Sequence, residues 1–443
     1  MRTSSLILCV SLAGCAVAPI SSHGAARDLR HTQQYGVAGP RKQAVPTGAV
    51  VARDGPNLQA LLRDPQGPKV IWLDGKAYHG DFTIRRPVEV HGATGCIIEG
   101  SKTSTVLDVE AEDVLLDNLT VRGTGHRHTA EDAGIKLKGK RLAVRNCFVD
   151  QGLFGVSLQL CDHCRVDATR VIGQAGEMEL RGDGIKLWEA HDSVVRGCDV
   201  TRSRDLVVWY SRRVLLEGNS VTQSRYGSHF MYAHDSVVRD SRVVDNVVGI
   251  FVMYSARLKV EGNVLAGAHG AAGIGIGFKE SDGVQVTGNW LVGNTTGTYL
   301  DRTPRSPAQP VVFRDNVIAL NDVGFRTHSS QEGVEWRGND FQENAVDGQV
   351  DGGGDALGMR FVDNFWSDYA GYDLDHDGYG DVAFEVKKLS SELTDAHPML
   401  RFFQGTAAMG LVDAVARAVP ILAAHLTLRD AHPAMQPRRL GRS

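Results

Sequence analysis

Two adjacent stretches, GSHFMYAHDSVVRDSRVVDNVV (residues 227–248) and GIFVMYSARLKVEGNVLAGAH (residues 249–269), contain the same unit twice. Each runs from a glycine through a short apolar strand, a polar turn and a second apolar strand to a small polar residue. The unit recurs about every 21 to 27 residues between Gly184 and Phe365. One unit cannot bury its apolar residues alone, whereas a stack of units shares a continuous core. The repeat therefore predicts an all-β solenoid, a right-handed parallel β-helix.

Two polar columns accompany the apolar repeat. A small polar residue closes each unit, and a second polar position follows about five residues later. Amide side chains stacked in this way can hydrogen-bond from coil to coil, so we expect both columns to lie inside the solenoid. The first column comprises Cys198, Asn219, Ser241, Asn263, Asn289, Asn316, Asn339 and Asn364, and the second comprises Asn246, Asn294, Asn321 and Asn344.

The first 15 residues have the pattern of an export signal. Arg2 precedes a short apolar run, Leu6–Leu12, which is too short to span a bilayer. The run ends in LAGC, and this sequence resembles a bacterial lipobox whose cysteine, Cys15, becomes lipidated. Lipidation would give a membrane-anchored periplasmic lipoprotein, and ordinary cleavage would give a soluble periplasmic protein. Both alternatives predict an exported chain.

The rest of the chain divides into four segments. Residues 16–47 are polar and aperiodic, as expected of a flexible tether, and residues 48–368 carry the β-helix repeat. A short amphipathic helix around Leu58–Leu62 is expected to cap the open edge of the first coil. An acidic loop occupies residues 369–385. Residues 386–443 contain a helix-favouring stretch, which either caps the last coil or docks onto a membrane partner.

Composition narrows the class of partner. The chain has 443 residues and a formal net charge of −4, without the basic stripe of a nucleic-acid-binding protein.

Cys161 and Cys164 have the spacing of a redox or metal pair, and we expect them at a solvent-accessible turn. They could form a local disulfide, be incidental thiols or relay copper. Cys147 and Cys198 coincide with the polar column and are expected to be interior fillers.

Strand alternation separates the side chains that face the core from those that face outward. Alignment of the coils on their first glycine predicts two inward columns: Ile185, Leu206, Ser228, Ile250 and Ile274, then Leu187, Val208, Phe230, Val252 and Ile276. It also predicts two outward columns: Lys186, Val207, His229, Phe251, Gly275 and Tyr299, then Trp188, Trp209, Met231, Met253 and Gly277.

The last of these columns is unusually apolar for an outer face. Such exposed patches usually mark interaction sites, although a terminal segment folded back along the solenoid could also cover this one. Trp188, Trp209 and Phe251 are candidates for a partner-binding surface or a sugar-stacking platform. Thioether and imidazole ligands together suit Cu(I) better than harder ions. His229, Met231 and Met253 are therefore candidate copper ligands.

The acidic loop resembles the first part of a calcium-binding loop. Asp373, Asp375, Asp377 and Asp381 stand at positions 1, 3, 5 and 9, and the residue at position 7, Tyr379, would offer its backbone carbonyl. The twelfth position lacks the usual glutamate. The alternatives are a structural Ca²⁺ site and a loop stabilised by Asx turns.

Four motifs carry a resemblance to a known family: RYGSHFMY (225–232), GIFVMYS (249–255), DGGGDALG (351–358) and DYAGYDLDHDGYGD (368–381). They resemble the NosD family of periplasmic accessory proteins for nitrous oxide reductase maturation. The resemblance implies a β-helix of the carbohydrate-binding and sugar-hydrolase (CASH) type, a membrane ABC transporter (permease and ATPase) as partner, and a role in assembling the copper-sulfide centre of the reductase. A copper chaperone would deliver the metal.

A carbohydrate-binding or polysaccharide-cleaving protein is the alternative, because parallel β-helices commonly carry such functions. Common glycosidases need two carboxylates about 5–10 Å apart beside a groove. Asp183 and Asp205 precede adjacent coils and form the best available pair. The outward columns otherwise hold Trp, Met, Gly and Val, so we expect a binding scaffold and no enzyme.

Overall fold

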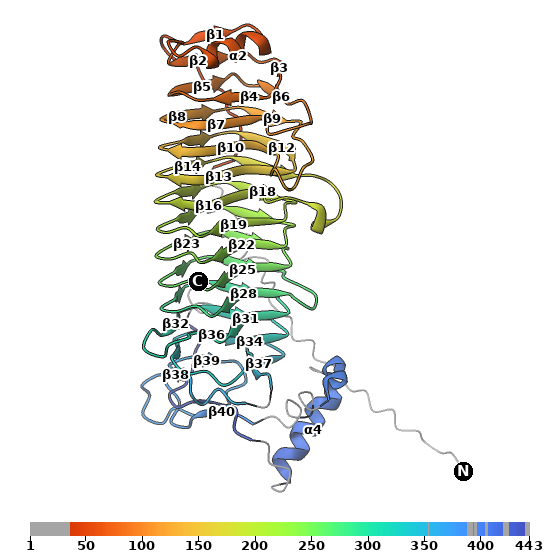
Figure 1. Cartoon of the computed structure of the whole chain (residues 1–443). Coiled ribbons are helices and arrows are strands. Elements are labelled where there is room, and N and C mark those ends of the chain that lie inside the picture. Colours follow the sequence, from red (N-terminus) through yellow and green to blue (C-terminus); the bar gives the residue numbers. More distant parts are fainter. Residues whose placement is uncertain are drawn as a thin grey trace, which may run out of the picture.

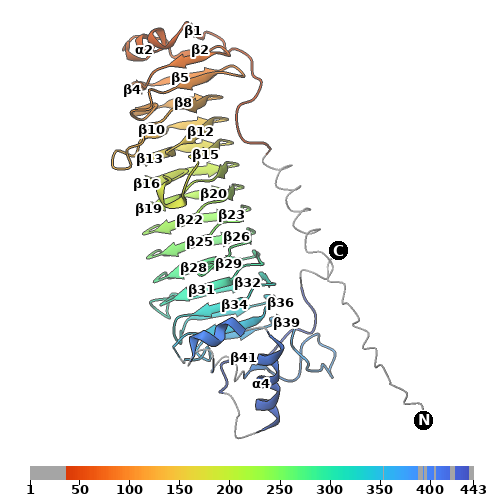
Figure 2. The same cartoon turned by 90° about the vertical axis from the view of Figure 1, so that its right-hand side faces the viewer.

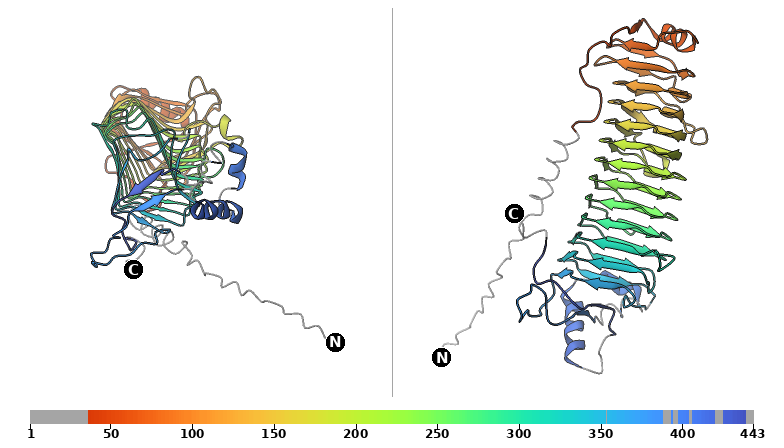
Figure 3. Two further views of the ribbon diagram at one scale, coloured as in Figure 1. Left: turned by 90° about the horizontal axis from the view of Figure 1, so that it is seen from below. Right: turned by 90° about the vertical axis from the view of Figure 1, so that its left-hand side faces the viewer.

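The computed structural model describes residues 36–352, 354–387, 393, 397–403, 406–419 and 425–438. The signal segment with Cys15 and the tether up to residue 35 lie outside these residues. Three long sheets, here named A, B and C, run the length of an elongated solenoid (Figure 1). Seen along its axis, the strands stack in register around a common interior (Figure 3). The predicted parallel β-helix is confirmed.

Sheet A contains β1 (Val50–Ala52), β2 (Val70–Leu73), β5 (Val88–Gly92), β8 (Val114–Asp117), β11 (Ala143–Arg145), β14 (Arg165–Asp167), β17 (Val194–Arg196), β20 (Leu215–Glu217), β23 (Val237–Arg239), β26 (Lys259–Glu261), β29 (Gln285–Thr287), β32 (Val311–Arg314), β35 (Val334–Arg337), β38 (Arg360–Val362), β41 (Leu428–Asp430) and β40 (Phe384–Val386). Sheet B contains β3 (Ala77–His79), β6 (Ile97–Glu99), β9 (Thr120–Arg122), β12 (Phe148–Gly152), β15 (Arg170–Gly173), β18 (Asp199–Thr201), β21 (Ser220–Thr222), β24 (Arg242–Val244), β27 (Val264–Ala266), β30 (Trp290–Val292), β33 (Val317–Ala319), β36 (Asp340–Gln342) and β39 (Phe365–Trp366). Sheet C contains β4 (Phe82–Ile84), β7 (Leu107–Glu112), β10 (Ala133–Lys140), β13 (Phe154–Asp162), β16 (Ile185–His191), β19 (Asp205–Trp209), β22 (Tyr226–Met231), β25 (Val248–Met253), β28 (Ile274–Lys279), β31 (Thr296–Asp301), β34 (Val323–Thr327) and β37 (Val346–Val350).

The register of sheet C confirms the predicted columns from β16 to β25 and corrects them at β28. Phe251 pairs with Gly277 instead of Gly275, and Met253 pairs with Lys279 instead of Gly277. The inward columns shift equally, so that Ile276 and Phe278 take the places predicted for Ile274 and Ile276. A longer turn between β27 and β28 causes the two-residue shift, because it contains the glycine on which the coil was aligned. The interior glycine of this coil is Gly275, whose backbone carbonyl would lie 2.3 Å from a Cβ on Gly249.

The polar columns form hydrogen-bonded ladders inside the solenoid. Each Asn side chain accepts a hydrogen bond from the backbone of the preceding coil and donates to a carbonyl within the core, as Asn263 does with Ser241 N and Val238 O. The amides also bond to each other, with Asn289 Nδ2 lying 3.0 Å from Asn316 Oδ1. Every member of the first predicted column is buried. The predicted interior stack is confirmed.

Separate elements close the two ends. Helix α2 (Gly55–Arg63) covers the first coil, with Asp54 as its N-cap and Leu58 and Leu62 buried, as predicted. At the other end, β41 pairs with β38 and β40. The carboxylate of Asp430 in β41 accepts hydrogen bonds from Asn364 and Trp366 and so terminates the first ladder. The solenoid core is thereby covered by strands at its C-terminal end.

Outside the coils, the described residues include three short helical elements. These are η1 (Met178–Leu180), η2 (Pro398–Phe403) and α4 (Ala407–Ala418), and α4 lies beside the C-terminal end of the solenoid (Figure 1). Met399 and Phe402 in η2 are each 87% exposed, and Leu411 in α4 is 65% exposed. Among the described residues, no helix is long and apolar enough to cross a membrane.

The described part of the expected tether lies against the solenoid. The segment that precedes β1 runs along the side of the coils (Figure 2). Gly39 donates a backbone hydrogen bond to Ala168, and the amide of Asn118 bonds to both the backbone N–H and the carbonyl of Arg41. Residues 36–47 are therefore attached to the coils, in contrast to the flexible tether expected from composition.

Candidate functional site

The candidate copper residues lie on the outer face of sheet C. Met231 in β22 pairs directly with Met253 in β25 and with Trp209 in β19. His229 points to the same side of β22 as Met231, because side chains two residues apart share a face. Neighbouring strands lie about 4.8 Å apart, so the two thioethers are close neighbours. The predicted column is present, but its Trp and Met side chains are half-buried instead of fully exposed.

His229 is enclosed by aromatic side chains. Its ring lies 4.7 Å from the ring of Tyr226 and 5.5 Å from that of Trp209, measured between centroids. The residue is 7% exposed, and neither ring nitrogen has a hydrogen-bond partner among the described residues. Buried polar atoms are nearly always paired, so these two nitrogens are unusual. The carboxylate of Asp205 lies nearby, with Oδ2 3.7 Å from Nδ1 of the ring.

A cavity opens beside the tryptophans of the same column. It has a volume of about 340 Å³ and is lined in part by Trp188, Trp209, Gln159 and Lys186. The ammonium group of Lys186 forms an ion pair with Glu131 and lies 5.7 Å from the ring of Trp209. The amide of Gln159 donates to the other oxygen of Glu131 at 2.7 Å. The cavity therefore combines the apolar ring faces of the two tryptophans with a hydrogen-bonded cluster of Lys186, Gln159 and Glu131.

The two aspartates of the enzyme alternative are inaccessible. The side chains of Asp183 and Asp205 are fully buried, and Arg204 and Arg225 respectively form ion pairs with them. Burial raises the pKa of Asp183 to about 6. Burial alone would also raise the pKa of Asp205, but contacts with His229 and Arg225 hold it below its ordinary value. Neither carboxylate can reach a substrate on the outer face.

In the acidic loop, one carboxylate oxygen from each of Asp373, Asp375 and Asp377 lies within 4.8 Å of the others. The backbone N–H groups of Asp377 and Gly378 donate to Asp373. Asp381 instead accepts a hydrogen bond from the backbone of Leu374 and is not part of this group. Three of the four predicted aspartates thus converge. Their backbone contacts equally suit Asx turns.

The cysteines are less accessible than predicted. Cys161 and Cys164 are fully buried free thiols, so the expectation of a solvent-accessible turn is wrong. Asp162 and His163 form the outer part of the turn, while the two sulfur atoms face backbone carbonyls inside the coil. Cys147 and Cys198 lie in the ladder as predicted, and burial raises the pKa of each thiol to about 12. Such thiols remain protonated and unreactive near neutral pH.

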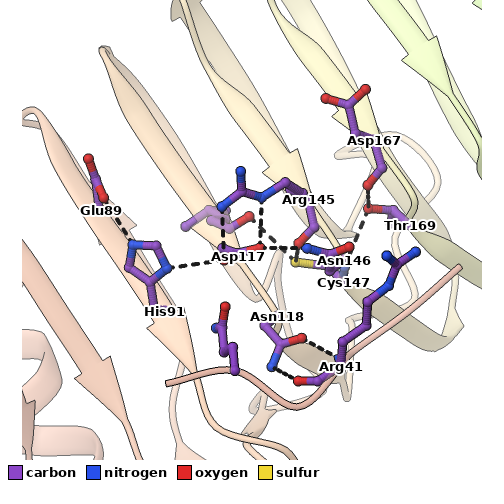
Figure 4. Close-up of polar contacts among 12 residues, drawn as sticks. Arg41, Glu89, His91, Asp117, Asn118, Arg145, Asn146, Cys147, Asp167 and Thr169 are labelled. Carbon is purple, nitrogen blue, oxygen red and sulfur yellow. Dashed lines mark hydrogen bonds and ion pairs between the residues drawn. The ribbon is translucent and has the colours of Figure 1, made fainter. Parts of the chain in front are cut away.

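A second cluster of ionisable groups lies on sheet A beside the N-terminal segment (Figure 4). The two ring nitrogens of His91 lie 3.1 Å from Asp117 and 3.0 Å from Glu89. Arg145 and Asn146 also donate to Asp117. Burial disfavours the charged imidazole, but the two carboxylates outweigh this effect and raise the pKa of His91. The side chains of His91, Asp117 and Glu89 are all paired with one another or with neighbouring residues, so we interpret the cluster as structural.

Sequence reasoning missed the residues that surround His229. The sequence pattern indicates Asp205 only as half of a carboxylate pair and does not distinguish Tyr226 from its neighbours. Asp205 occupies the position equivalent to Gly184 at the start of its coil, where strand alternation gives no side-chain direction. Its contact with His229 depends on the register between β19 and β22, which the sequence repeat defines only to within a turn.

Comparisons with known proteins agree with the motifs. A family model described as "Periplasmic copper-binding protein (NosD)" matches residues 163–371. The "Probable ABC transporter binding protein NosD" of Pseudomonas aeruginosa is 27% identical over an alignment of 463 residues, gaps included. The alignment covers 90% of this chain and 95% of that protein. The protein of the same name from Stutzerimonas stutzeri is 26% identical and covers 86% and 90% of the two chains. These relatives are named as binding proteins and not as enzymes.

A shorter protein of that name from Pseudomonas aeruginosa is 31% identical over 90 residues, which cover 82% of its length and 20% of this chain. Among solved structures, the N-terminal fragment of the bacteriophage phi29 gene product 12 has a TM-score of 0.51 at 10% identity, covering 77% of this chain and 72% of that one. That likeness concerns the fold alone. The sequence relatives and the motifs together show that the chain belongs to the NosD family.

Proposed function

We propose that this chain is an exported periplasmic accessory protein for the maturation of nitrous oxide reductase. It is a non-catalytic scaffold that takes part in assembling the copper-sulfide centre together with a membrane ABC transporter. The names of the family model and of the relatives support copper binding and a transporter partner. Lipidation of Cys15 would hold the scaffold at the membrane.

The observation that carries the proposal is the buried, unpaired imidazole of His229 beside two register-paired methionines. Cu(I) accepts soft thioether and imidazole ligands, and two or three of them in an open arrangement permit later release. We assign Met231, Met253 and His229 as these ligands. The half-buried indoles of Trp188 and Trp209 would provide contact area to a copper chaperone. The predicted surface role of Phe251 is wrong, because this side chain is only 7% exposed and packs against Tyr226.

Competition for Cu(I) against a chromophoric chelator tests the site. Replacing both Met231 and Met253 with leucine keeps size and apolarity, so the fold is expected to persist. The double variant is expected to lose Cu(I) retention. A matched control changes Met178 and Met435, two half-buried methionines away from sheet C, to leucine. Equal Cu(I) affinity in both double variants would contradict the assignment.

For the acidic loop we propose Ca²⁺ bound by Asp373, Asp375 and Asp377, with the carbonyl of Tyr379 and with Asp381 completing the set after a small rearrangement. The convergence of three carboxylates supports this proposal. Removing Ca²⁺ with a chelator is then expected to lower the melting temperature and to expose residues 370–443 to protease. Unchanged melting and unchanged proteolysis would leave Asx turns as the explanation of the acidic pattern.

A saccharide-binding function is a second candidate, favoured by the cavity beside Trp188 and Trp209. Sugar rings pack on aromatic faces, and the ion pair of Lys186 with Glu131 offers donors and acceptors for hydroxyl groups. Titration with oligosaccharides, followed by tryptophan fluorescence, tests it. A response that Trp188→Phe abolishes and Trp290→Phe retains would support this function. A response in neither protein would exclude the tested sugars.

A further inference from the structure

Asp205 is held rigidly next to the proposed copper site. Arg225 donates from Nε to Oδ1 of Asp205 at 3.0 Å and from Nη2 to Oδ2. The backbone N–H of Tyr226 also donates to Oδ1, at 3.2 Å. A bidentate guanidinium contact fixes the plane of a carboxylate. The orientation of this buried carboxylate is therefore determined by Arg225 and the start of β22.

The second oxygen of this carboxylate faces the imidazole of His229. Oδ2 lies 3.7 Å from Nδ1, which is longer than a hydrogen bond but well within the range of electrostatic attraction. Tyr226 and Trp209 pack against the ring and limit its rotation. Neutral histidine has one N–H group and one lone pair, and an ionised carboxylate only accepts. The proton is therefore favoured on Nδ1, and the lone pair on Nε2.

We infer that Asp205, held by Arg225, is the positioning residue that fixes His229 as the Nδ1–H tautomer and keeps the Nε2 lone pair free for a soft metal ion. The metal part of this inference rests on the proposed function. Partners that bind the second nitrogen of a metal-ligating histidine commonly set its tautomer and strengthen its ligation. Nε2 is buried and has no partner among the described residues, as such a ligand requires.

The preceding coil provides a natural comparison. Asp183 is likewise bound by an arginine, but both guanidinium nitrogens of Arg204 contact Oδ1, and Oδ2 has no hydrogen-bond partner among the described residues. His229 lies in the coil after Asp205, and the residue that occupies the same column in the coil after Asp183 is Val207, which has no polar side-chain group. The aspartate–arginine pair therefore recurs as a structural element of two coils, and only the later one faces an imidazole. Asp183 is accordingly the matched control for Asp205.

Replacing Asp205 with asparagine tests the inference without a change in shape. The one amide oxygen is required at the Oδ1 position, where Arg225 and the Tyr226 backbone donate. The NH₂ group then takes the Oδ2 position, where it opposes Nη2 of Arg225. No acceptor then faces Nδ1, so the imidazole proton is expected to move to Nε2. Nitrogen NMR of the ¹⁵N-histidine-labelled full chain, with His229 assigned by its absence in H229Q, reports the tautomer directly.

The expected spectra show Nδ1–H in the wild type and in D183N, and Nε2–H in D205N. Cu(I) affinity is expected to fall by about 10–100-fold in D205N and to stay unchanged in D183N. If D205N does not fold, the position of the His229 proton in the wild-type spectrum tests the inference by itself. The inference is overturned if His229 of the wild type carries its proton on Nε2. It is also overturned if folded D205N shows the same tautomer as the wild type. An inverted tautomer with normal copper binding supports the positioning role and contradicts His229 as a ligand.

Discussion

His91 lies between two carboxylates, and its contribution to stability depends on pH in a defined direction. Its pKa is raised in the folded chain because Asp117 and Glu89 outweigh the effect of burial. A histidine whose pKa is higher in the folded chain than in the unfolded chain stabilises the folded state. This stabilisation is complete at pH values below the unfolded-state pKa, and it disappears as pH rises through the folded-state pKa. The charged groups that face the ring are Glu89 and Asp117, and Asp117 is itself bound by Arg145.

We therefore expect the melting temperature to fall as pH rises from about 6.5, the ordinary pKa of histidine, through the higher pKa of His91 in the folded chain. The variant His91→Gln is expected to show a smaller fall over the same range, measured by circular dichroism. Asp117 has the opposite sign: its pKa is lowered, so its contribution decreases in acid. Parallel curves for the wild type and H91Q would contradict the role assigned to His91.

At the scale of residues, the sequence predicted side-chain direction better than side-chain partners. Strand alternation placed His229, Met231 and Met253 on one outer face, and the register agrees. It could not indicate that Cys161 and Cys164 point inward, because a register shift interrupts the alternation of β13 before Cys161, and Cys164 lies in the turn before β14. Nor could it place Asp205 beside His229, because that contact joins two coils.

At the scale of elements, the asparagine ladder links neighbouring coils through buried polar groups. Asn263 accepts from Ser241 N and donates to Val238 O. Replacing it with leucine leaves both groups without partners, at a cost of about 1–3 kcal/mol for each in the free energy of unfolding. Urea denaturation of N263L is expected to show this loss.

The chain itself supplies the control for this prediction. Ser241 occupies the same ladder one coil earlier, and its hydroxyl accepts from the backbone of Asn219. Asn263→Ser should therefore retain a partner for Ser241 N and lose less stability than N263L. If both variants lost equal stability, the cost would come from volume and not from unpaired groups.

The register shift at β28 shows the limit of repeat-based prediction for an element. The coil contains three alternating glycines in AAGIGIG, and sequence spacing does not distinguish the one that faces the core. The structure selects Gly275, because a Cβ on this residue would lie 2.7 Å from the carbonyl oxygen of Gly297 and 3.0 Å from Nδ2 of the ladder residue Asn294. A longer turn before the strand absorbs the two extra residues. The error thus affected β28 alone and left the candidate copper residues in place.

At the scale of the whole molecule, the fold was predictable because one repeated pattern specifies every coil. The ends were only partly predictable: α2 agrees with its amphipathic pattern, whereas β40 and β41 cover the last coil by pairing between distant segments. The candidate site lies midway along sheet C, on strands fixed by neighbours on both sides. A site on such rigid strands can hold soft ligands at constant spacing.

We propose that the methionine pair on sheet C binds copper during the assembly of the copper-sulfide centre of nitrous oxide reductase. The most direct measurement is the copper content and activity of the reductase purified from cells that carry this chain as M231L/M253L. We expect a reductase deficient in its copper-sulfide centre, while the control M178L/M435L gives a complete enzyme and both variants accumulate normally. A complete reductase from cells with the M231L/M253L variant would contradict the claim.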